Sequence, residues 1–206
     1  MIAAFLLPAL SLEHIQLEFN TCSHYNHSIT ITKMPSMRHI MNTHRLTLSE
    51  LTLQDVSDTQ QDSNSLLHDI LSVLSPNVIA HLPPNFQGLT TIKHAKDWLI
   101  NMLKDSRVFA ITGLDDDSLR GFIFIHNSDT HQYHIGYLLA EGYWGKGYAQ
   151  EALSAFIHWC KSTPSIKELI AGVEKSNLAS TAVLTKMGFT FQSEHQNSML
   201  FYTQIL

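Results

Sequence analysis

The run "EGYWGKGYAQEAL", residues 141–153, is the feature that most constrains how this chain can fold. Three glycines and one lysine lie between an apolar segment, 131–140, and a segment whose apolar residues recur at helical spacing. A strand that enters such a turn and continues as a helix leaves the first N–H groups of the helix unpaired, beside the positive end of the helix dipole. The run therefore predicts a binding site for an anionic group, most often a phosphate.

Two common phosphate-binding loops do not fit this spacing. A P-loop has four residues between its first two glycines and then Lys-Ser or Lys-Thr, whereas Gly142 precedes Gly145 by three positions and Lys146 is followed by Gly147. The dinucleotide fingerprint would need a glycine where the chain has Gln150, and it belongs to a repeated βαβ array. The sequence excludes the first class and leaves the second weakly supported.

From His44 onward, the apolar pattern predicts a regular order of strands and helices. A single βαβ step lies between antiparallel hairpins, so we expect an α/β domain with a mixed, mostly antiparallel sheet flanked by helices. The strands are predicted at 44–53, 107–112, 119–126, 131–140, 167–173, 189–193 and 198–204, and the helices at 55–74, 91–104, 148–160 and 178–187, with Gly188 closing the last.

The composition is that of a globular protein with one domain. The chain has 206 residues, 44% of them hydrophobic, and a formal net charge of -5. This acidity disfavours a dedicated nucleic-acid binder, which carries a basic excess to offset phosphate charge. The two cysteines, Cys22 and Cys160, lie far apart and indicate no disulfide framework, which predicts a cytoplasmic protein.

The first 43 residues follow neither a sustained helical period nor a strand alternation, so we place the domain at 44–206. We expect 1–43 to be an N-terminal extension or the artefact of an early assigned start, because Met34, Met37 and Met41 lie just upstream of the domain. The apolar opening "MIAAFLLPAL" lacks a positive n-region and is too short to span a bilayer. No membrane association is predicted.

Two clusters are open to a metal-binding interpretation, and we favour neither. Cys22, His24 and His27 lie in one short run without a fourth ligand at a helpful spacing. The acidic run 115–117 points its side chains in different directions, as a solvated turn does. We therefore predict no metal site.

The segment "IGYLLAEGYWGKGYAQEAL" resembles the acetyl-CoA loop of the GNAT N-acetyltransferase superfamily, whose motif is Gln/Arg-x-x-Gly-x-Gly/Ala. The match runs from Trp144, which replaces the Gln or Arg, through Gly147 to Ala149. The form Tyr-Trp-Gly-Lys-Gly-Tyr-Ala is similar to the branch that contains the RimJ/RimL-type N-terminal acetyltransferases of ribosomal proteins. Trp144, although it departs from the general motif, therefore indicates which branch of the superfamily the chain resembles.

A second segment, "VEKSNLASTAVLTKMGFTF", is similar to the later stretch of the family, in which Asn and Ser open a helix that ends in Lys-x-Gly-Phe. The opening "HRLTLSELTLQD" resembles the first strand of the branch, so the likeness covers residues 44–206. The matching residues of the second segment are Asn177, Ser180, Lys186, Gly188 and Phe189.

The resemblance implies a GNAT (acyl-CoA N-acyltransferase) fold and a transfer of acetyl from acetyl-CoA, as cosubstrate, to a primary amine by direct attack in a ternary complex. The implied acceptor is a protein N-terminal α-amino group, such as that of a ribosomal protein. A small-molecule amine, such as a polyamine or an antibiotic, is an alternative acceptor. A non-catalytic acyl-CoA-binding regulatory module is an alternative of another class.

The resemblance also assigns residues to the cofactor. We expect the N–H groups of Gly145, Gly147 and Ala149 to bind the pyrophosphate, with Lys146 as a mobile charge. The strand end 138–140 is expected to splay from its neighbour at a bulge and to offer an N–H to the carbonyls of acetyl-CoA. The aromatic residues of the loop could stack on adenine or support the loop from beneath. The complete predicted set is Leu138, Leu139, Ala140, Trp144, Gly145, Lys146, Gly147, Tyr148, Ala149 and Asn177.

Two catalytic residues are predicted by the same resemblance. Ser180 matches a serine that hydrogen-bonds or protonates the departing sulfur in some relatives, and an exposed helix serine is its alternative. His134 lies where relatives often carry Glu and could accept the proton of the incoming amine, or could be a packed strand residue. Tyr137 and Glu141 are further candidates for the base. Asn177 is either a helix N-cap or a contact to the pantetheine arm.

Overall fold

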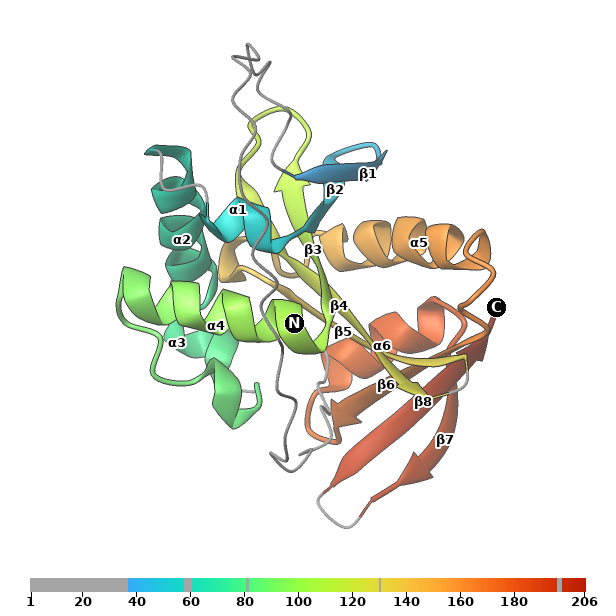
Figure 1. The fold of residues 1–206 in the computed structure, drawn as a ribbon. Helices are drawn as coiled ribbons and strands as arrows, with labels where there is room; N and C mark the ends of the chain where they lie inside the picture. Colours follow the sequence, from blue (N-terminus) through green and yellow to red (C-terminus); the bar gives the residue numbers. More distant parts are fainter. Residues whose placement is uncertain (1–36, 58–60, 81, 130, 196–197) are drawn as a thin grey trace, which may run out of the picture.

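The computed structural model describes residues 37–57, 61–80, 82–129, 131–195 and 198–206. Its centre is an eight-stranded sheet with the order β1-β2-β3-β4-β5-β6-β8-β7 (Figure 1). Within the described chain every pair of neighbouring strands is antiparallel except β5 and β6, which are parallel. The strands are β1 Arg38–Asn42, β2 Leu46–Leu51, β3 Arg107–Gly113, β4 Leu119–Asp129, β5 Gln132–Leu139, β6 Glu168–Glu174, β7 Thr190–Glu194 and β8 Met199–Ile205.

Helices cover both faces of this sheet. One face packs on α1 to α4 and the other on α5 and α6, which lie on opposite sides of the sheet in Figure 1. The helices are α1 Leu53–Ser57, α2 Gln61–Val73, α3 Pro76–Ile79, α4 Ile92–Asp105, α5 Tyr148–Lys161 and α6 Leu178–Lys186, with short 3-10 helices η1 Pro84–Phe86 and η2 Glu141–Tyr143. The predicted mixed, mostly antiparallel sheet flanked by helices is therefore confirmed.

The central strands are apolar at nearly every position because both of their faces are buried. On β4, Phe122 and Phe124 belong to the core under α1 to α4, while Ile123 and Ile125 belong to the core under α5 and α6. Successive side chains of a strand point to opposite faces, so one strand contributes to both cores. The same alternation decides on which side of the sheet each residue of β5 lies.

The helices next to the glycine-rich run match the prediction. The six apolar positions of the predicted stripe on α5 are all buried; they are Ala149, Ala152, Leu153, Phe156, Ile157 and Cys160. At the end of α6, Gly188 has a φ of +90°, and the N–H of Phe189 donates to the carbonyl of Leu184 at 3.0 Å. A glycine in this left-handed conformation ends a helix without steric cost, as the sequence predicted.

The predicted single helix over 55–74 is wrong. The described chain has α1 and α2 there, and residues 58–60 between them lie outside the described residues. The backbone N–H and the hydroxyl of Thr52 donate to Asp55 at 2.6 and 2.8 Å, which fixes the chain at the entry to α1. Pro76 follows the end of α2, as expected, but it also begins α3, where its missing N–H costs no hydrogen bond.

The sheet begins upstream of His44, where the sequence analysis places the start of the domain. β1 pairs with β2 from Arg38–Glu50 to Asn42–Thr47. Its sequence, RHIMN, has no apolar alternation because β1 is an edge strand whose residues are exposed or half-buried. Residues 1–36, with Cys22, His24 and His27, lie outside the described residues.

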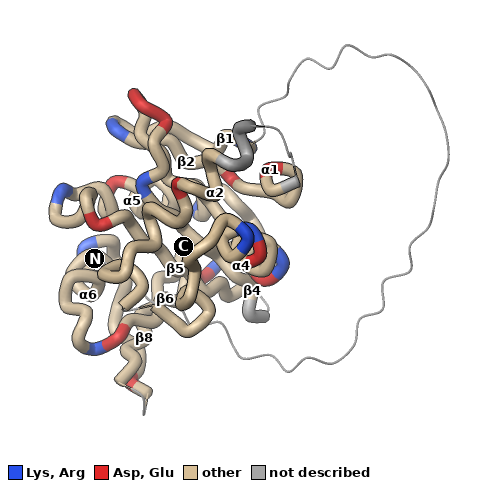
Figure 2. The backbone as a smooth tube through the Cα atoms, turned by 90° about the vertical axis from the view of Figure 1, so that its left-hand side faces the viewer, with Lys and Arg blue, Asp and Glu red and all other residues tan. Residues whose placement is uncertain are grey.

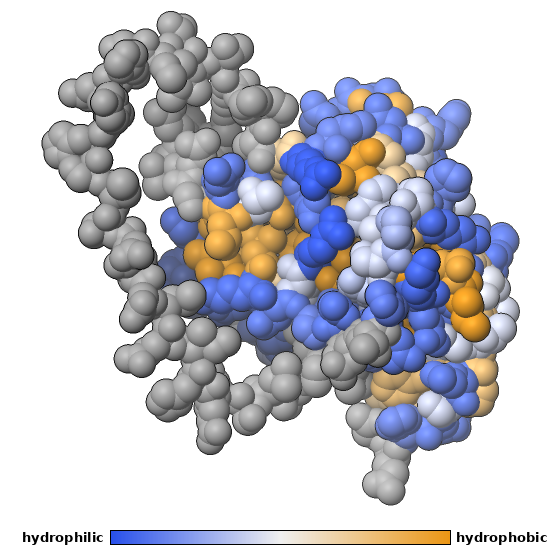
Figure 3. Space-filling view, turned by 45° about the vertical axis from the view of Figure 1, so that its right-hand side comes forward, coloured by the Kyte–Doolittle hydropathy of each residue, from blue (hydrophilic) through white to orange (hydrophobic). Residues whose placement is uncertain are grey.

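The charges and the apolar residues of the surface are dispersed. Figure 2 shows basic and acidic residues interspersed along the backbone, with both signs on α4. In Figure 3 apolar patches lie between hydrophilic side chains. No helix among the described residues is both long enough and apolar enough to cross a membrane. The large apolar side chains that the described chain leaves exposed come from separate segments; they are Leu53, Leu114, Leu178, Phe191 and Ile205.

The pairing of β1 predicts a difference between two shortened chains. A chain that begins at Met37 keeps β1, whereas one that begins at Met41 lacks the residues that pair with Ser49 and Glu50 of β2. We expect the Met41 chain to unfold at a lower temperature, by about 2–4 °C for each kcal/mol that the β1–β2 pairing contributes. Equal midpoints in thermal unfolding by circular dichroism would show that β1 adds nothing to the stability of the domain.

Candidate active site

The pairing between β5 and β6 ends in the middle of the sheet. β5 pairs with β6 through only three residues, of which His134, opposite Ile170, is the last. Beyond this point β5 continues to pair with β4 as far as Leu139, and β6 continues to pair with β8 as far as Glu174. The two strands therefore separate, as the family resemblance predicts, and β5 after His134 is not paired with β6.

The predicted bulge at the end of β5 is wrong. The register between β4 and β5 remains regular up to the pair of Gly121 and Leu139, and it shifts only at Asn127/Asp129, near the start of β5. The separation of β5 from β6 therefore occurs without an inserted residue at 138–140.

The three residues at the end of β5 have different surroundings. Leu138 is completely buried in the core under α1 to α4, while Leu139 packs in the opposite core. The N–H of Ala140 donates to the carbonyl of Arg120 at 2.8 Å, so this amide is already used within the sheet. Of the three predicted residues, the structure places Leu139 in the cavity described below.

The glycine-rich run adopts the backbone that its glycines permit. Gly145 has a φ of +70° and Gly147 a φ of +81°, which non-glycine residues rarely adopt. Gly147 is the N-cap of α5 and provides no side chain to bind the first N–H groups of the helix. A Cβ atom at Gly145 would have no neighbour within 4 Å, so the space above the loop is open to a ligand.

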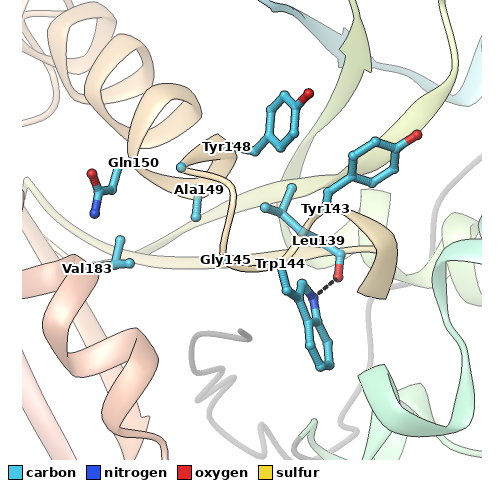
Figure 4. Close-up of a pocket in the computed structure, with 9 residues that line it drawn as sticks. Leu139, Tyr143, Trp144, Gly145, Tyr148, Ala149, Gln150 and Val183 are labelled. Atoms are coloured by element: carbon cyan, nitrogen blue, oxygen red, sulfur yellow. Dashed lines mark hydrogen bonds between the residues drawn. The ribbon is translucent and has the colours of Figure 1, made fainter.

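A cavity of about 90 Å³ lies at this turn. Figure 4 shows that the loop and the first turn of α5 form one side and that Val183 of α6 lies across from Gln150. The cavity therefore joins the end of β5, the N-terminus of α5 and the face of α6. Its lining residues are Leu139, Tyr143, Trp144, Gly145, Gly147, Tyr148, Ala149, Gln150 and Val183.

The aromatic residues of the loop support its shape. The indole Nε1 of Trp144 donates to the carbonyl of Leu139 at 2.7 Å, drawn as a dashed line in Figure 4. The rings of Tyr143 and Tyr148 pack edge to face with their centroids 5.5 Å apart. The Cζ atom of Arg120 lies 5.0 Å from the centroid of each ring. Of the two roles considered for these rings, support of the loop is the one that these contacts provide.

Lys146 does not reach into the cavity. Its Nζ donates to the carbonyl of Gly142 at 2.7 Å, within the same loop, and its side chain is exposed. The backbone N–H groups at the start of α5, and not the Lys146 ammonium, are the groups of this loop that could bind an anion in the cavity.

Asn177 is the N-cap of α6, because its side-chain oxygen accepts a hydrogen bond from the N–H of Ser180 at 3.1 Å. The capping interpretation from the sequence is confirmed, and the contact to a pantetheine arm stays a prediction. Ser180 has no exposed surface, so its alternative as an exposed helix serine is wrong.

Tyr137 lies on β5 beside Ser180, with its hydroxyl shielded from solvent. Burial raises the pKa of Tyr137 well above its usual value, and the nearby Ser180 side chain only partly opposes this shift. The phenol therefore stays protonated at neutral pH. Tyr137 fits the role of a hydrogen-bond donor better than that of the base for which the sequence analysis considered it.

His134 lies on the other face of β5. Strand alternation places it with Leu138, on the side of α1 to α4, while Tyr137 and Ser180 belong to the side of α5 and α6. His126 is its neighbour on β4. Burial and, to a smaller extent, the charge of His126 lower the pKa of His134, so its imidazole is neutral at pH 7 and can accept a proton.

The two predicted catalytic residues, His134 and Ser180, therefore lie on opposite faces of the sheet. Glu141, the other candidate base, is exposed and accepts both hydrogen bonds of the Asn77 amide, at 2.9 and 3.0 Å.

Cys160 is not available as a nucleophile. It is completely buried on α5, and burial raises the pKa of its thiol to about 12. A thiolate is the reactive form of cysteine, so this residue supports no covalent intermediate at neutral pH.

A second cavity, of about 310 Å³, lies along the same two helices and is more polar. The side chains of Lys161 and Lys186 give it a cationic character, and His158 also lines it. The remaining lining residues are Ser154, Ile157, Met187 and Gln204.

The acidic run 115–117 lies in a turn in which Asp116 accepts hydrogen bonds from the N–H and hydroxyl of Ser118 and pairs with Arg120. Along the described chain, no three side chains of His, Cys, Asp or Glu gather as a metal site would require.

The predicted set of cofactor residues lacks Tyr143, Gln150 and Val183 of the cavity, and Arg45 beside it. Val183 follows Ser180 by one helical turn, so its position on the same face of α6 could have been found from the spacing. Arg45 contacts the loop from the turn between β1 and β2, and no local pattern indicates a contact between segments so far apart.

Comparisons with known proteins agree with this geometry. The family described as "Acetyltransferase (GNAT) domain" matches residues 45–190. The chain is 30% identical over 114 residues to an uncharacterized N-acetyltransferase of Bacillus subtilis, YnaD, and this alignment covers 54% of the chain and 65% of YnaD, just under two thirds of that relative.

Two solved structures share the fold at low sequence identity. One is the ribosomal L7/L12 alpha-N-protein acetyltransferase RimL in complex with coenzyme A, with 17% identity, a TM-score of 0.64 and coverage of 82% of this chain and 98% of that one. The other is the ribosomal-protein-S5-alanine acetyltransferase from Vibrio fischeri, with 17% identity, a TM-score of 0.65 and coverage of 81% and 96%.

Gly147 lines the cavity and has a positive φ, so we predict that a side chain there weakens the binding of coenzyme A. Gly147→Val introduces a branched side chain at the cavity and a strained φ that costs about 1–2 kcal/mol. Titration calorimetry should show binding weaker by about tenfold or more.

Gly88→Val is the matched control, because Gly88 has a similar φ of +75° and open space around it, outside the cavity. The control should lose comparable stability and retain its affinity for coenzyme A. Equal affinities of the two variants would contradict the assignment of this cavity.

Proposed function

Because the chain belongs to the GNAT acetyltransferase family, we propose that it transfers an acetyl group from acetyl-CoA to a primary amine. The observation that carries this proposal is the cavity at the start of α5, where a glycine-rich turn meets the part of β5 that is not paired with β6. The glycine-rich turn offers N–H groups to a phosphate, and this part of β5 offers backbone groups to an extended chain with amide groups.

The elements of the site correspond to the parts of acetyl-CoA. The pyrophosphate binds at the N-terminus of α5, beside Gly147, Tyr148 and Ala149. The pantetheine arm, which has two amide groups, lies along β5 beyond His134 and uses the backbone groups that β6 does not pair. The acetyl end then reaches the separation point of the strands, between His134 and Ser180.

The adenosine end, which carries a 3′-phosphate, lies in the second cavity. This cavity lies beside the same two helices as the first, α5 and α6, and Lys161 and Lys186 supply positive charge. A phosphate that remains partly hydrated gains modest stabilisation from such exposed cations.

The chemistry is a direct attack. The neutral amine nitrogen attacks the thioester carbonyl carbon, a C–N bond forms, and the C–S bond breaks to release the thiolate of coenzyme A. His134, neutral at pH 7, accepts the proton that the amine loses, directly or through water. Ser180 donates a hydrogen bond to the departing thiolate, and the protonated Tyr137 beside it stabilises the hydroxyl in that orientation.

We place the chain in the RimJ/RimL-like branch and propose a protein N-terminal α-amino group, such as that of a ribosomal protein, as acceptor. The form of the loop around Trp144 and the likeness to the two ribosomal-protein acetyltransferases support this acceptor. Small-molecule amines are the second class of acceptor. A cytoplasmic location follows from the same proposal, since ribosomal proteins are made there.

A release assay for free thiol tests the proposal. The chain is incubated with acetyl-CoA and with peptides that carry each N-terminal residue, with the same peptides N-acetylated as controls, and with polyamines. We expect thiol release only with free α-amino groups. Release with polyamines alone would move the acceptor to the small-molecule class, and acetyl-CoA binding without release for any amine would indicate a binding module.

If His134 is the base, its lowered pKa determines how the rate depends on pH. Activity should fall on the acid side as His134 becomes protonated, with a midpoint below about 6.5, the usual value for histidine. His134→Gln should lower kcat by about 100-fold and remove this acid limb. A variant that retains kcat and an unchanged pH profile would exclude His134 as the base.

The variant His126→Gln separates the two causes of the lowered pKa of His134, which are burial and the charge of His126. Removing the charge of His126 should move the acid limb of the profile to slightly higher pH, because burial, the larger cause, remains. The initial rate measured from pH 5 to 8 with saturating acetyl-CoA gives both profiles.

The second cavity predicts a preference for the 3′-phosphate. Lys161→Glu with Lys186→Glu should weaken the binding of acetyl-CoA by about tenfold, since two favourable charges become unfavourable, and should affect dephospho-CoA much less. Lys104→Glu on α4, on the opposite face of the sheet, is the control. An equal loss for both ligands would place the 3′-phosphate elsewhere.

A further inference from the structure

The hairpin between β1 and β2 contacts the start of α5. The N–H of Thr43 donates to the carbonyl of Leu46 at 2.8 Å, and the N–H of Leu46 donates to the Thr43 hydroxyl oxygen at 2.9 Å. This tight turn directs Thr43 and Arg45 toward Glu151 in the first turn of α5. Two segments more than 100 positions apart are joined here.

Both carboxylate oxygens of Glu151 are used in this contact. Oε1 accepts from the Thr43 hydroxyl at 2.6 Å and from the backbone N–H of Arg45 at 2.7 Å, and Oε2 accepts from Nε of Arg45 at 2.7 Å. The Glu151 side chain is only 18% exposed. Although burial alone would raise it, these hydrogen bonds hold the pKa of Glu151 below its usual value, so the carboxylate is charged.

The other end of the Arg45 side chain reaches the glycine-rich loop. Its Nη1 donates to the carbonyl of Lys146 at 3.1 Å, and its Cζ lies 4.0 Å from the centre of the Tyr148 ring. Its Nη2 is also the atom nearest to a Cβ built on Gly147, at 3.6 Å. One guanidinium therefore contacts the residues on both sides of the N-cap of α5.

This contact fixes the direction of an amide that faces the cavity. The carbonyl of Lys146 and the N–H of Gly147 belong to one planar trans peptide, so they point in opposite directions. When Arg45 holds the carbonyl on its own side, the N–H of the cavity-lining Gly147 is oriented away from it.

We propose that Arg45, held by Glu151, is a positioning residue that preorganises the Lys146–Gly147 peptide for acetyl-CoA. The inference rests on the proposed function, in which the pyrophosphate binds at this turn. Arg45 acts through the loop and not through contact with the acetyl group, so its loss weakens binding of acetyl-CoA and leaves the chemical step nearly intact.

A lysine cannot replace this arginine. The guanidinium binds the carboxylate and the carbonyl through different nitrogen atoms while its plane faces the tyrosine ring, whereas an ammonium is a single point charge. Arg45→Lys should therefore retain the fold and lose most of the positioning effect.

The test compares Arg45→Ala, Arg45→Lys and Glu151→Gln with the wild-type chain. Each is measured for the Kd of acetyl-CoA by calorimetry, for the KM of each substrate, for kcat and for thermal unfolding. We expect the Kd and KM of acetyl-CoA to rise by about tenfold in Arg45→Ala, as for the loss of a charged hydrogen bond, with kcat and the KM of the amine nearly unchanged.

Arg107→Ala is the matched control. Arg107 pairs with Glu50 at 2.6 Å and lies over the rings of Phe109 and Trp159, so it makes the same kinds of contact in a part of the sheet that does not touch the loop. It should lose comparable stability and keep the wild-type Kd for acetyl-CoA. This comparison separates positioning from a general loss of stability.

The outcomes distinguish the two levels of the proposal. If the wild-type chain binds acetyl-CoA and all three variants bind it equally well, the positioning role of Arg45 is wrong while the proposed function stands. If the wild-type chain binds no acetyl-CoA, the proposed function fails and this inference fails with it. Arg45→Lys and Glu151→Gln are close in size to the native residues, so they provide the test even where Arg45→Ala does not fold.

Discussion

A strand edge inside a folded domain must find partners for its backbone N–H and carbonyl groups, and β5 leaves such an edge beyond His134. β4 supports the other edge of β5 as far as Leu139, so the strand keeps its direction up to the glycine-rich turn. The helix that follows begins at the same place, with its own first N–H groups unpaired. The proposed path of acetyl-CoA depends on these two backbone segments, whose N–H and carbonyl groups lack partners within the described chain, lying next to each other at the cavity.

The parts of the fold that could be predicted are those with a local signal. The stripe on α5, the cap at Gly188 and the apolar runs of the central strands each reflect burial of neighbouring positions, and the structure confirms them. β1 has no such signal, because an edge strand with exposed polar residues shows no alternation. The presence of two helices, α1 and α2, was also not predicted, since both bury apolar residues at helical spacing.

The features of the site also divide into those with a local signal in the sequence and those without one. Positive φ at Gly145 and Gly147 and the cap at Asn177 are local requirements, so the sequence contains them. The contact of Arg45 with the loop joins distant segments and could not be read from spacing. His134 and Ser180 lie on opposite faces of the sheet. This placement depends on how the sheet packs between its two cores, so the sequence alone did not show it.

Hydrogen exchange of the backbone amides, followed with and without acetyl-CoA, tests the central claim most directly. If acetyl-CoA occupies the two unsaturated segments, protection should rise at 145–150 in the loop and the first turn of α5 and at 135–139 on β5. The amides of β3, which pair on both sides within the sheet, should change little. Protection that appears at neither segment, or only on the face of α1 to α4, would contradict this account.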